Sequence, residues 1–132
     1  MAASKYDFNI EQGSSFKLTI VYKDDNGVPI DISNYCARLT WRAGNQNIQI
    51  FSTENQDLSL YNFYIDGPTG QLIFLLPATV TNDLDFSTAK YDLELQSDQD
   101  LYIGGGKEIT RILYGTITLI KRNSQINTTL AC

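Results

Sequence analysis

The sequence predicts an all-β fold: an antiparallel β-sandwich of the immunoglobulin-like kind, with about eight strands and one short helix. Three observations support this fold class. Short segments of alternating apolar and polar residues recur along the chain, and clusters of Gly, Pro, Asn and Asp separate them. The length of 132 residues suits a single domain, and no linker or repeat divides it. We expect one sandwich domain over residues 1–122 and a tail over 123–132, where the alternation is lost.

The strongest strand is predicted at Ile109–Ile120 (ITRILYGTITLI), and we place it at the centre of a sheet. Alternation predicts that one apolar face carries Ile109, Leu113, Ile117 and Leu119. Arg111 falls within this apolar register, where its stem could cover the core while its charge reaches water. Gly115 lies mid-strand, which indicates a bulge or the close approach of another backbone. The natural partner is Tyr91–Leu95, joined to it through a long loop over Ser97–Gly106.

The other elements follow in chain order. Alternation predicts strands at Tyr6–Ile10, Ser15–Lys23 and Tyr35–Arg42, and weaker ones at Ile48–Phe51 and around Phe63 and Ile65. The segment Gln71–Leu76 (QLIFLL) is apolar at almost every position, which is typical of a strand buried on both faces. Asp25–Gly27 is a tight-turn signal. Only Pro77–Leu84 is expected to be helical, because proline suits a first helical turn.

Composition and charge exclude several classes of protein. The net charge is −5 with no basic cluster, so a nucleic acid would be repelled and we expect no nucleic-acid binding. No stretch approaches the roughly 20 apolar residues of a membrane span, so we expect no membrane association. The first residues do not resemble a signal peptide, which predicts synthesis in a cytoplasm. The chain has no histidine, which removes Ser-His-Asp and Cys-His pairs and HExxH zinc sites.

No motif in the chain predicts catalysis. The carboxylates around the Asp25–Gly27 turn lack the spacing of a calcium loop. The stretch Gly104–Lys107 lacks the phosphate-loop pattern and precedes a strand instead of a helix. Cys36 and Cys132 are too few to form a disulfide framework and are interpreted as unreactive thiols. We therefore expect no enzymatic activity, no catalytic or metal site, and no cofactor.

Aromatic residues offer the best candidate site. Tyr61, Phe63, Tyr64 and Tyr102 fall in segments with weak strand signals, and aromatic residues are enriched at protein interfaces. Packing at the end of the sandwich explains them equally well. We hypothesise that residues 43–66 and the tail 121–132 make most of the contacts to other chains. The alternative function is a small ligand-binding sandwich, for example a carbohydrate-binding one.

The order of several short motifs resembles a known family. The segments are YDFNIEQGSSFKLTIVYKDDNGVPIDISNYCARLTWR, GQLIFLLPATVTNDLDFSTAKYDLEL and ITRILYGTITL. They are similar to small structural proteins of tailed bacteriophages, including the N-terminal β-sandwich of phage baseplate upper proteins. The matching positions are Gln12, Gly13, Phe16, Gly27, Pro29, Ile30, Asp31, Tyr35, Ala37, Arg38, Tyr91–Leu95, Thr110, Arg111, Ile112, Leu113, Gly115, Ile117 and Leu119.

This resemblance covers residues 6–120 and implies a virion part that docks to other virion proteins. It implies several copies in a symmetric assembly, located in the tail or baseplate after synthesis in the host cytoplasm. Two departures from the family pattern stand out. Residues 43–66 are longer and more aromatic than the pattern, which suggests a contact loop specific to this protein. No long domain follows residue 120, so a fibre-like or receptor-binding extension is not expected.

Overall fold

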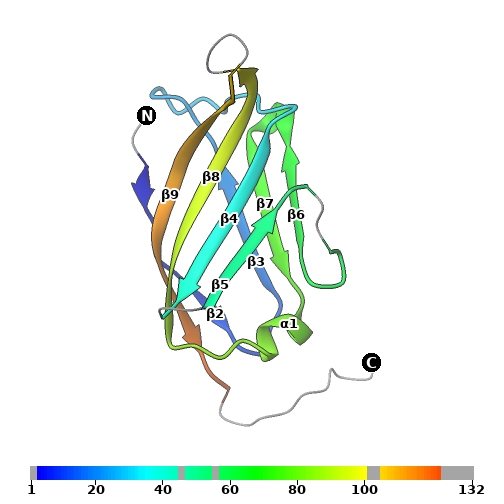
Figure 1. Cartoon of the computed structure of the whole chain (residues 1–132), viewed down its shortest axis with the longest axis vertical. Helices are drawn as coiled ribbons and strands as arrows, with labels where there is room; N and C mark the ends of the chain where they lie inside the picture. The colour runs from blue at the N-terminus through cyan, green and yellow to red at the C-terminus, as the bar shows by residue number, and fades with distance from the viewer. Residues whose placement is uncertain (1–2, 45–46, 55–56, 101–104, 123–132) are drawn as a thin grey trace.

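A computed structural model of the chain describes residues 3–44, 47–54, 57–100 and 105–122. Two β-sheets pack face to face, with one short helix at an end of the sandwich (Figure 1). The larger sheet contains β1 (Ser4–Lys5), β2 (Phe8–Glu11), β4 (Cys36–Ala43), β5 (Asn47–Ser52), β8 (Thr88–Asp100) and β9 (Lys107–Ile120). The smaller sheet contains β3 (Phe16–Val21), β6 (Asn62–Asp66) and β7 (Gln71–Leu76). The predicted all-β sandwich is confirmed.

The two sheets differ in width and in strand direction. The larger sheet has the order β1-β9-β8-β4-β5, and β2 also pairs with β9. The smaller sheet has the order β3-β7-β6. Most neighbours are antiparallel, as predicted, but β1 and β2 run parallel to β9. Parallel pairing needs a long connection, and here almost the whole chain provides it.

Helical structure is confined to short pieces in the described residues. The helix α1 (Ala78–Asn82) lies inside the predicted Pro77–Leu84 segment, with Pro77 at its N-cap. A 3-10 turn at Gly67–Thr69 was not predicted, although Pro68 near its start suits such a turn. The β8–β9 hairpin is confirmed, and β8 extends to Asp100, beyond the predicted loop boundary at Ser97.

The core lies between the sheets and is rich in aromatic rings. The alternating residues Ala37, Leu39 and Trp41 of β4 are buried, as are Tyr91, Leu93 and Leu95 of β8. Strand β7 is buried on both faces, as its composition predicted, with Leu72, Ile73, Phe74 and Leu76 almost inaccessible. The ring of Phe74 contacts the rings of Phe16, Phe51, Tyr61 and Phe63. Each fully buried apolar side chain of this size stabilises a fold by about 1.5–3 kcal/mol.

A β-bulge at Ile112 corrects the predicted register of β9. Leu113 lies opposite Leu93, whereas Arg111 lies opposite Glu94, so Ile112 is an extra residue on this strand. The extra residue shifts the alternation, so that in the part of β9 before Ile112 the residues predicted to face inward face outward instead. Ile109 is therefore exposed instead of buried, and Arg111 belongs to the outer face instead of the apolar register.

Gly115 admits the backbone of the N-terminal segment, which is one of the two roles predicted for it. A Cβ atom at this position would clash with the carbonyl oxygen of Tyr6 and lie 2.7 Å from Asp7 Oδ1. Asp7 interrupts the ladder between β1 and β2, and its carboxylate accepts a hydrogen bond from the N–H of Thr116 (2.8 Å). The buried hydroxyl of Tyr91 donates a hydrogen bond to the Tyr6 carbonyl oxygen. Three contacts thus attach the N-terminal segment at one point of β9.

The pair Gln12-Gly13 holds the end of the sandwich near α1. The Gln12 side chain donates to the Leu84 carbonyl oxygen (3.0 Å) and accepts from the N–H of Arg122 (3.0 Å). Gly13 has a positive φ of 83°, which favours glycine, and its N–H donates to Thr81 Oγ1 (3.1 Å). Thr81 is fully buried and donates to the Ser14 carbonyl oxygen (2.8 Å). This network joins the β2–β3 turn, the helix and the end of β9.

Replacing Gly115 with alanine should destabilise the fold by about 1–3 kcal/mol, because overpacking at a close backbone approach forces strands apart. We expect a lower midpoint in urea unfolding followed by Trp41 fluorescence. Gly106→Ala is the matched control, since a Cβ there would meet no atom within 4 Å. Equal midpoints for the Gly115→Ala and Gly106→Ala variants would contradict this role of Gly115.

Candidate interaction surface

Exposed large apolar side chains are concentrated in one short segment of the chain. In the described part of the chain, ten large apolar residues are exposed: Tyr6, Val28, Ile48, Ile50, Leu58, Leu60, Tyr64, Ile109, Tyr114 and Ile120. Half of them lie within residues 48–64, a short part of the chain. We call this set, namely Ile48, Ile50, Leu58, Leu60 and Tyr64, the β5–β6 surface. It falls inside the segment 43–66 that the sequence predicted as a contact region.

Strand β5 places the two isoleucines on the outer face of the larger sheet. It is an edge strand, because its register pairs it with β4 alone. Phe51 faces inward, with its ring centroid 4.7 Å from that of Trp41 and 5.1 Å from that of Phe74. Since strand side chains alternate, Ile48 and Ile50 must face outward, and Ile50 is 61% exposed. The packing of Phe51 therefore determines the exposure of its neighbours.

Strand β6 and the loop before it supply the rest of the surface. Tyr64 lies opposite Ile73 on the outer face of the smaller sheet and is 41% exposed. Leu58 is 71% exposed and borders an open hollow of about 350 Å³. The hollow is also lined by Lys17, Asn62, Leu75 and Pro77. The hollow beside Leu58 is thus open, which suits contact with another surface better than enclosure of a small ligand.

The aromatic residues predicted for the site do not share one environment. Phe63 is 1% exposed and Tyr61 is 9% exposed, so both belong to the core. Their burial favours the alternative interpretation, in which they close the sandwich. Tyr64 is the member of the set that the structure leaves accessible, whereas Tyr102 and the tail 123–132 lie outside the described residues.

The hydroxyl of Tyr61 caps the end of β5. It accepts a hydrogen bond from the N–H of Ser52 (3.2 Å) and donates to the Ser52 carbonyl oxygen (3.3 Å). These two backbone groups would otherwise be unpaired, because Ser52 lies at the last position of an edge strand. Tyr61 therefore has a structural role that its weak strand pattern did not reveal.

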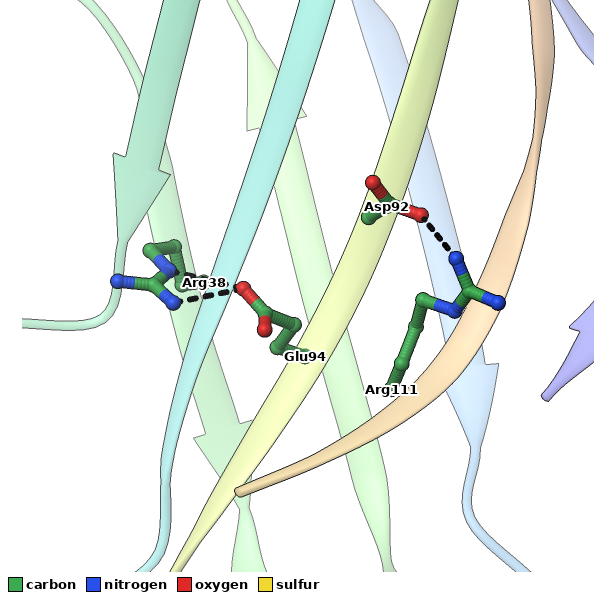
Figure 2. A network of polar contacts seen from close by, with 4 residues as sticks. All are labelled: Arg38, Asp92, Glu94 and Arg111. Carbon is green, nitrogen blue, oxygen red and sulfur yellow. Dashed lines mark hydrogen bonds and ion pairs between the residues drawn. The ribbon is translucent and has the colours of Figure 1, made fainter. Parts of the chain in front are cut away.

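The outer face of the larger sheet carries two ion pairs across neighbouring strands (Figure 2). Arg38 of β4 contacts Glu94 of β8 (2.7 Å), and Arg111 of β9 contacts Asp92 of β8 (3.1 Å). Exposed pairs of this kind contribute about 0.2–1 kcal/mol each. The Arg111 guanidinium also lies 5.0 Å from the centre of the Tyr114 ring. These carboxylates are engaged in cross-strand pairing, and the arrangement gives them a structural role.

A small hollow beside Arg38 contains the thiol of Cys36. Its Sγ donates a hydrogen bond to Glu54 Oε1 (2.8 Å), and Gln96 and Ile109 complete the lining. Burial, followed by the Glu54 carboxylate, raises the pKa of the Cys36 thiol to about 11. The thiol is therefore neutral near pH 7, and a neutral thiol is a poor nucleophile.

Other kinds of site have little support in the described residues. They contain no group of three or more His, Cys, Asp or Glu side chains placed to hold a metal ion. Of the three exposed tyrosines in the described part of the chain, Tyr64 lies on the smaller sheet, whereas Tyr6 and Tyr114 are neighbours at the edge of the larger one, so the three rings do not form one platform. Among the helices described, none has the length and apolar character needed to cross a membrane.

The sequence matches no protein-family model and no curated protein.

The exposed apolar residues of the β5–β6 surface lie within the segment predicted from the sequence, but of these five residues only Tyr64 was singled out there. The prediction singled out aromatic residues, whereas four of the five members of the β5–β6 surface are aliphatic. The alternation of this strand did carry a signal. Ile48 and Ile50 must lie on one face and Phe51 on the other, so both faces carry apolar residues. Only one face can pack on the core.

The raised pKa of Cys36 predicts slow alkylation. At pH 8 its thiolate fraction should be about 100-fold below that of a thiol with an ordinary pKa near 9. We expect the native Cys132→Ser variant to react with iodoacetamide slower than the urea-unfolded variant by this factor. The alkylation rate of the native protein should rise as the pH approaches about 11, because the raised pKa means that the reactive thiolate becomes abundant only near that pH. Native and unfolded rates that agree at pH 8 would contradict the burial and hydrogen bonding described for Cys36.

Proposed function

We propose that the protein is a structural virion component of a tailed bacteriophage. In this proposal it acts as an adaptor in the tail or baseplate, docks to other virion proteins and is present in several copies. It would be made in the host cytoplasm and act in the assembled virion, without catalysing a reaction. The proposal draws on the family resemblance over residues 6–120 and on the confirmed sandwich fold.

One observation carries the docking role. The β5–β6 surface concentrates five exposed apolar side chains in one short segment of a small protein, on and between an edge strand of each sheet. Exposed apolar groups that cluster in this way mark interaction sites more often than scattered ones do. The segment that bears them is also the one that departs from the family pattern by its length. A part specific to this chain would then select its partner, while the shared sandwich supports it.

Engineered variants of this surface can test the docking role. Leu58→Ser and Tyr64→Ser remove apolar contacts without opening the core, so stability should change by less than about 0.5 kcal/mol. Val28→Ser is the matched control, because Val28 is also exposed but lies in the β3–β4 connection. Each variant would be supplied to cells that make the other virion proteins of the same phage. The amount in purified particles and the melting temperature would both be measured.

We expect the Leu58→Ser/Tyr64→Ser double variant to melt normally and to be at least tenfold depleted from particles, a loss equivalent to about 1.4 kcal/mol of contact energy. The Val28→Ser protein should be incorporated like the wild type. Absence of the wild-type protein from purified particles would refute the virion role. Normal incorporation of the double variant would leave the virion role but remove the β5–β6 surface from it.

A further inference from the structure

Strand β5 presents unpaired backbone groups on its free edge. The N–H of Thr53 donates to the Ala37 carbonyl oxygen (3.0 Å), whereas the N–H and C=O of Ser52 point away from β4, toward Tyr61. Backbone directions alternate along an antiparallel strand, so the N–H and C=O groups of Ile50 and Ile48 point to the same free side as those of Ser52. Within the described residues these four groups have no hydrogen-bond partner.

The edge of β5 lacks the features that normally block strand addition. Its sequence NIQIFS contains no charge and no proline, and its register with β4 is continuous, without a bulge. The other described edges are better protected. Strand β3 carries Lys17, β6 ends in Asp66, and Asp7 interrupts the edge formed by β1 and β2. An unprotected strand among protected ones is a specific feature of this edge.

Two cations, Arg42 and Lys90, lie in line with Ile48 across the sheet. Arg42 is directly opposite Lys90 in the β4–β8 register, and both are exposed. Like charges placed opposite each other destabilise a sheet. Neither side chain forms an ion pair with a described residue, in contrast to Arg38 and Arg111 on the same face. Arg42 has Lys90 on one neighbouring strand and Ile48 on the other, at the same level of the sheet. A strand added to the free edge of β5 would therefore lie two strands away from β4, which carries Arg42.

We propose that β5 accepts an extended strand of a partner chain that carries aliphatic side chains and a carboxylate on alternate positions. The added strand pairs with the free backbone groups of Ile48 and Ile50. Its aliphatic side chains cover the two isoleucines, and its carboxylate reaches over Ile48 to Arg42, the nearer of the two cations. The hydroxyl of Tyr61 already occupies the groups of Ser52 and so ends the site there. The proposal deepens the proposed docking function by naming the partner's chemistry.

The test uses the purified full chain and two synthetic peptides, so it does not depend on phage particles. The first peptide is acetyl-Glu-Thr-Val-Thr-Val-Thr-Glu-amide, which presents Glu and Val on one face in either strand direction. The second replaces both Glu residues with Lys. Each is titrated into the ¹⁵N-labelled protein, and amide shifts and hydrogen exchange are followed residue by residue. We expect the Glu peptide to slow exchange at Ile48 and Ile50 and to bind at least tenfold more tightly than the Lys peptide.

Two variants make the test specific. Ile50→Pro removes only an N–H that faces the free edge, so the β4–β5 ladder should survive and binding should be lost. Ile50→Val is its control and should bind like the wild type. Arg42→Glu should reverse the preference for the Glu peptide and favour the Lys peptide. This variant tests the role of charge in binding even if Ile50→Pro fails to fold.

Three results would overturn the proposal. The first is equal affinity for the two peptides. The second is a set of shifts centred on the hollow beside Leu58 and not on β5. The third is a concentration-dependent dimer that protects Ile48 and Ile50 without any peptide, which would make a second copy of this chain the occupant of the edge.

Discussion

The contact between the rings of Phe51 and Phe74 holds the two sheets together on the side where both have free edges. Phe51 belongs to the edge strand β5 and Phe74 to the middle strand of the smaller sheet. Tyr61 packs edge-on against Phe51 and bonds to the backbone of Ser52, so the same cluster also fixes the end of β5. Because side chains alternate along the strand, Ile48 and Ile50 are then exposed to solvent. The composition of the core on this side thus dictates the chemistry of the surface next to it.

In the proposed function, the chain divides its residues between support and contact. Positions that match the family pattern mostly have structural roles: Gln12 and Gly13 join the helix to the end of β9, and Gly115 admits the N-terminal segment. The segment that departs from the pattern carries the β5–β6 surface. The separation applies to side chains and not to the whole segment, because Phe51, Tyr61 and Phe63 of the same segment are buried in the core. Changes at its exposed positions therefore need not disturb the supporting network.

Alternation in the sequence predicted the strands β4 and β8 with their buried faces, and an almost unbroken apolar run predicted β7, because these strands have neighbours on both sides. It could not predict the bulge at Ile112, since a bulge depends on how the neighbouring strand is offset. The same limit applies to the N-terminal strands, whose partner is more than a hundred residues away in the chain. For the candidate surface, apolar residues on both faces of β5 gave no sign of which face the core would take. The burial of Phe63 and Tyr61 depended on packing between sheets, which periodicity does not encode.

The parallel pairing of β1 and β2 with β9 has a consequence for the order of folding. A bond such as that between Asp7 and Thr116 spans 109 residues, so β1 and β2 must wait for β9 to be synthesised. Until then Phe8 and Ile10 have no neighbouring strand to pair with. Closing so long a loop is slow relative to hairpin formation. The sandwich is complete only after β9 has been synthesised, and a nascent chain must keep β1 and β2 soluble during that delay.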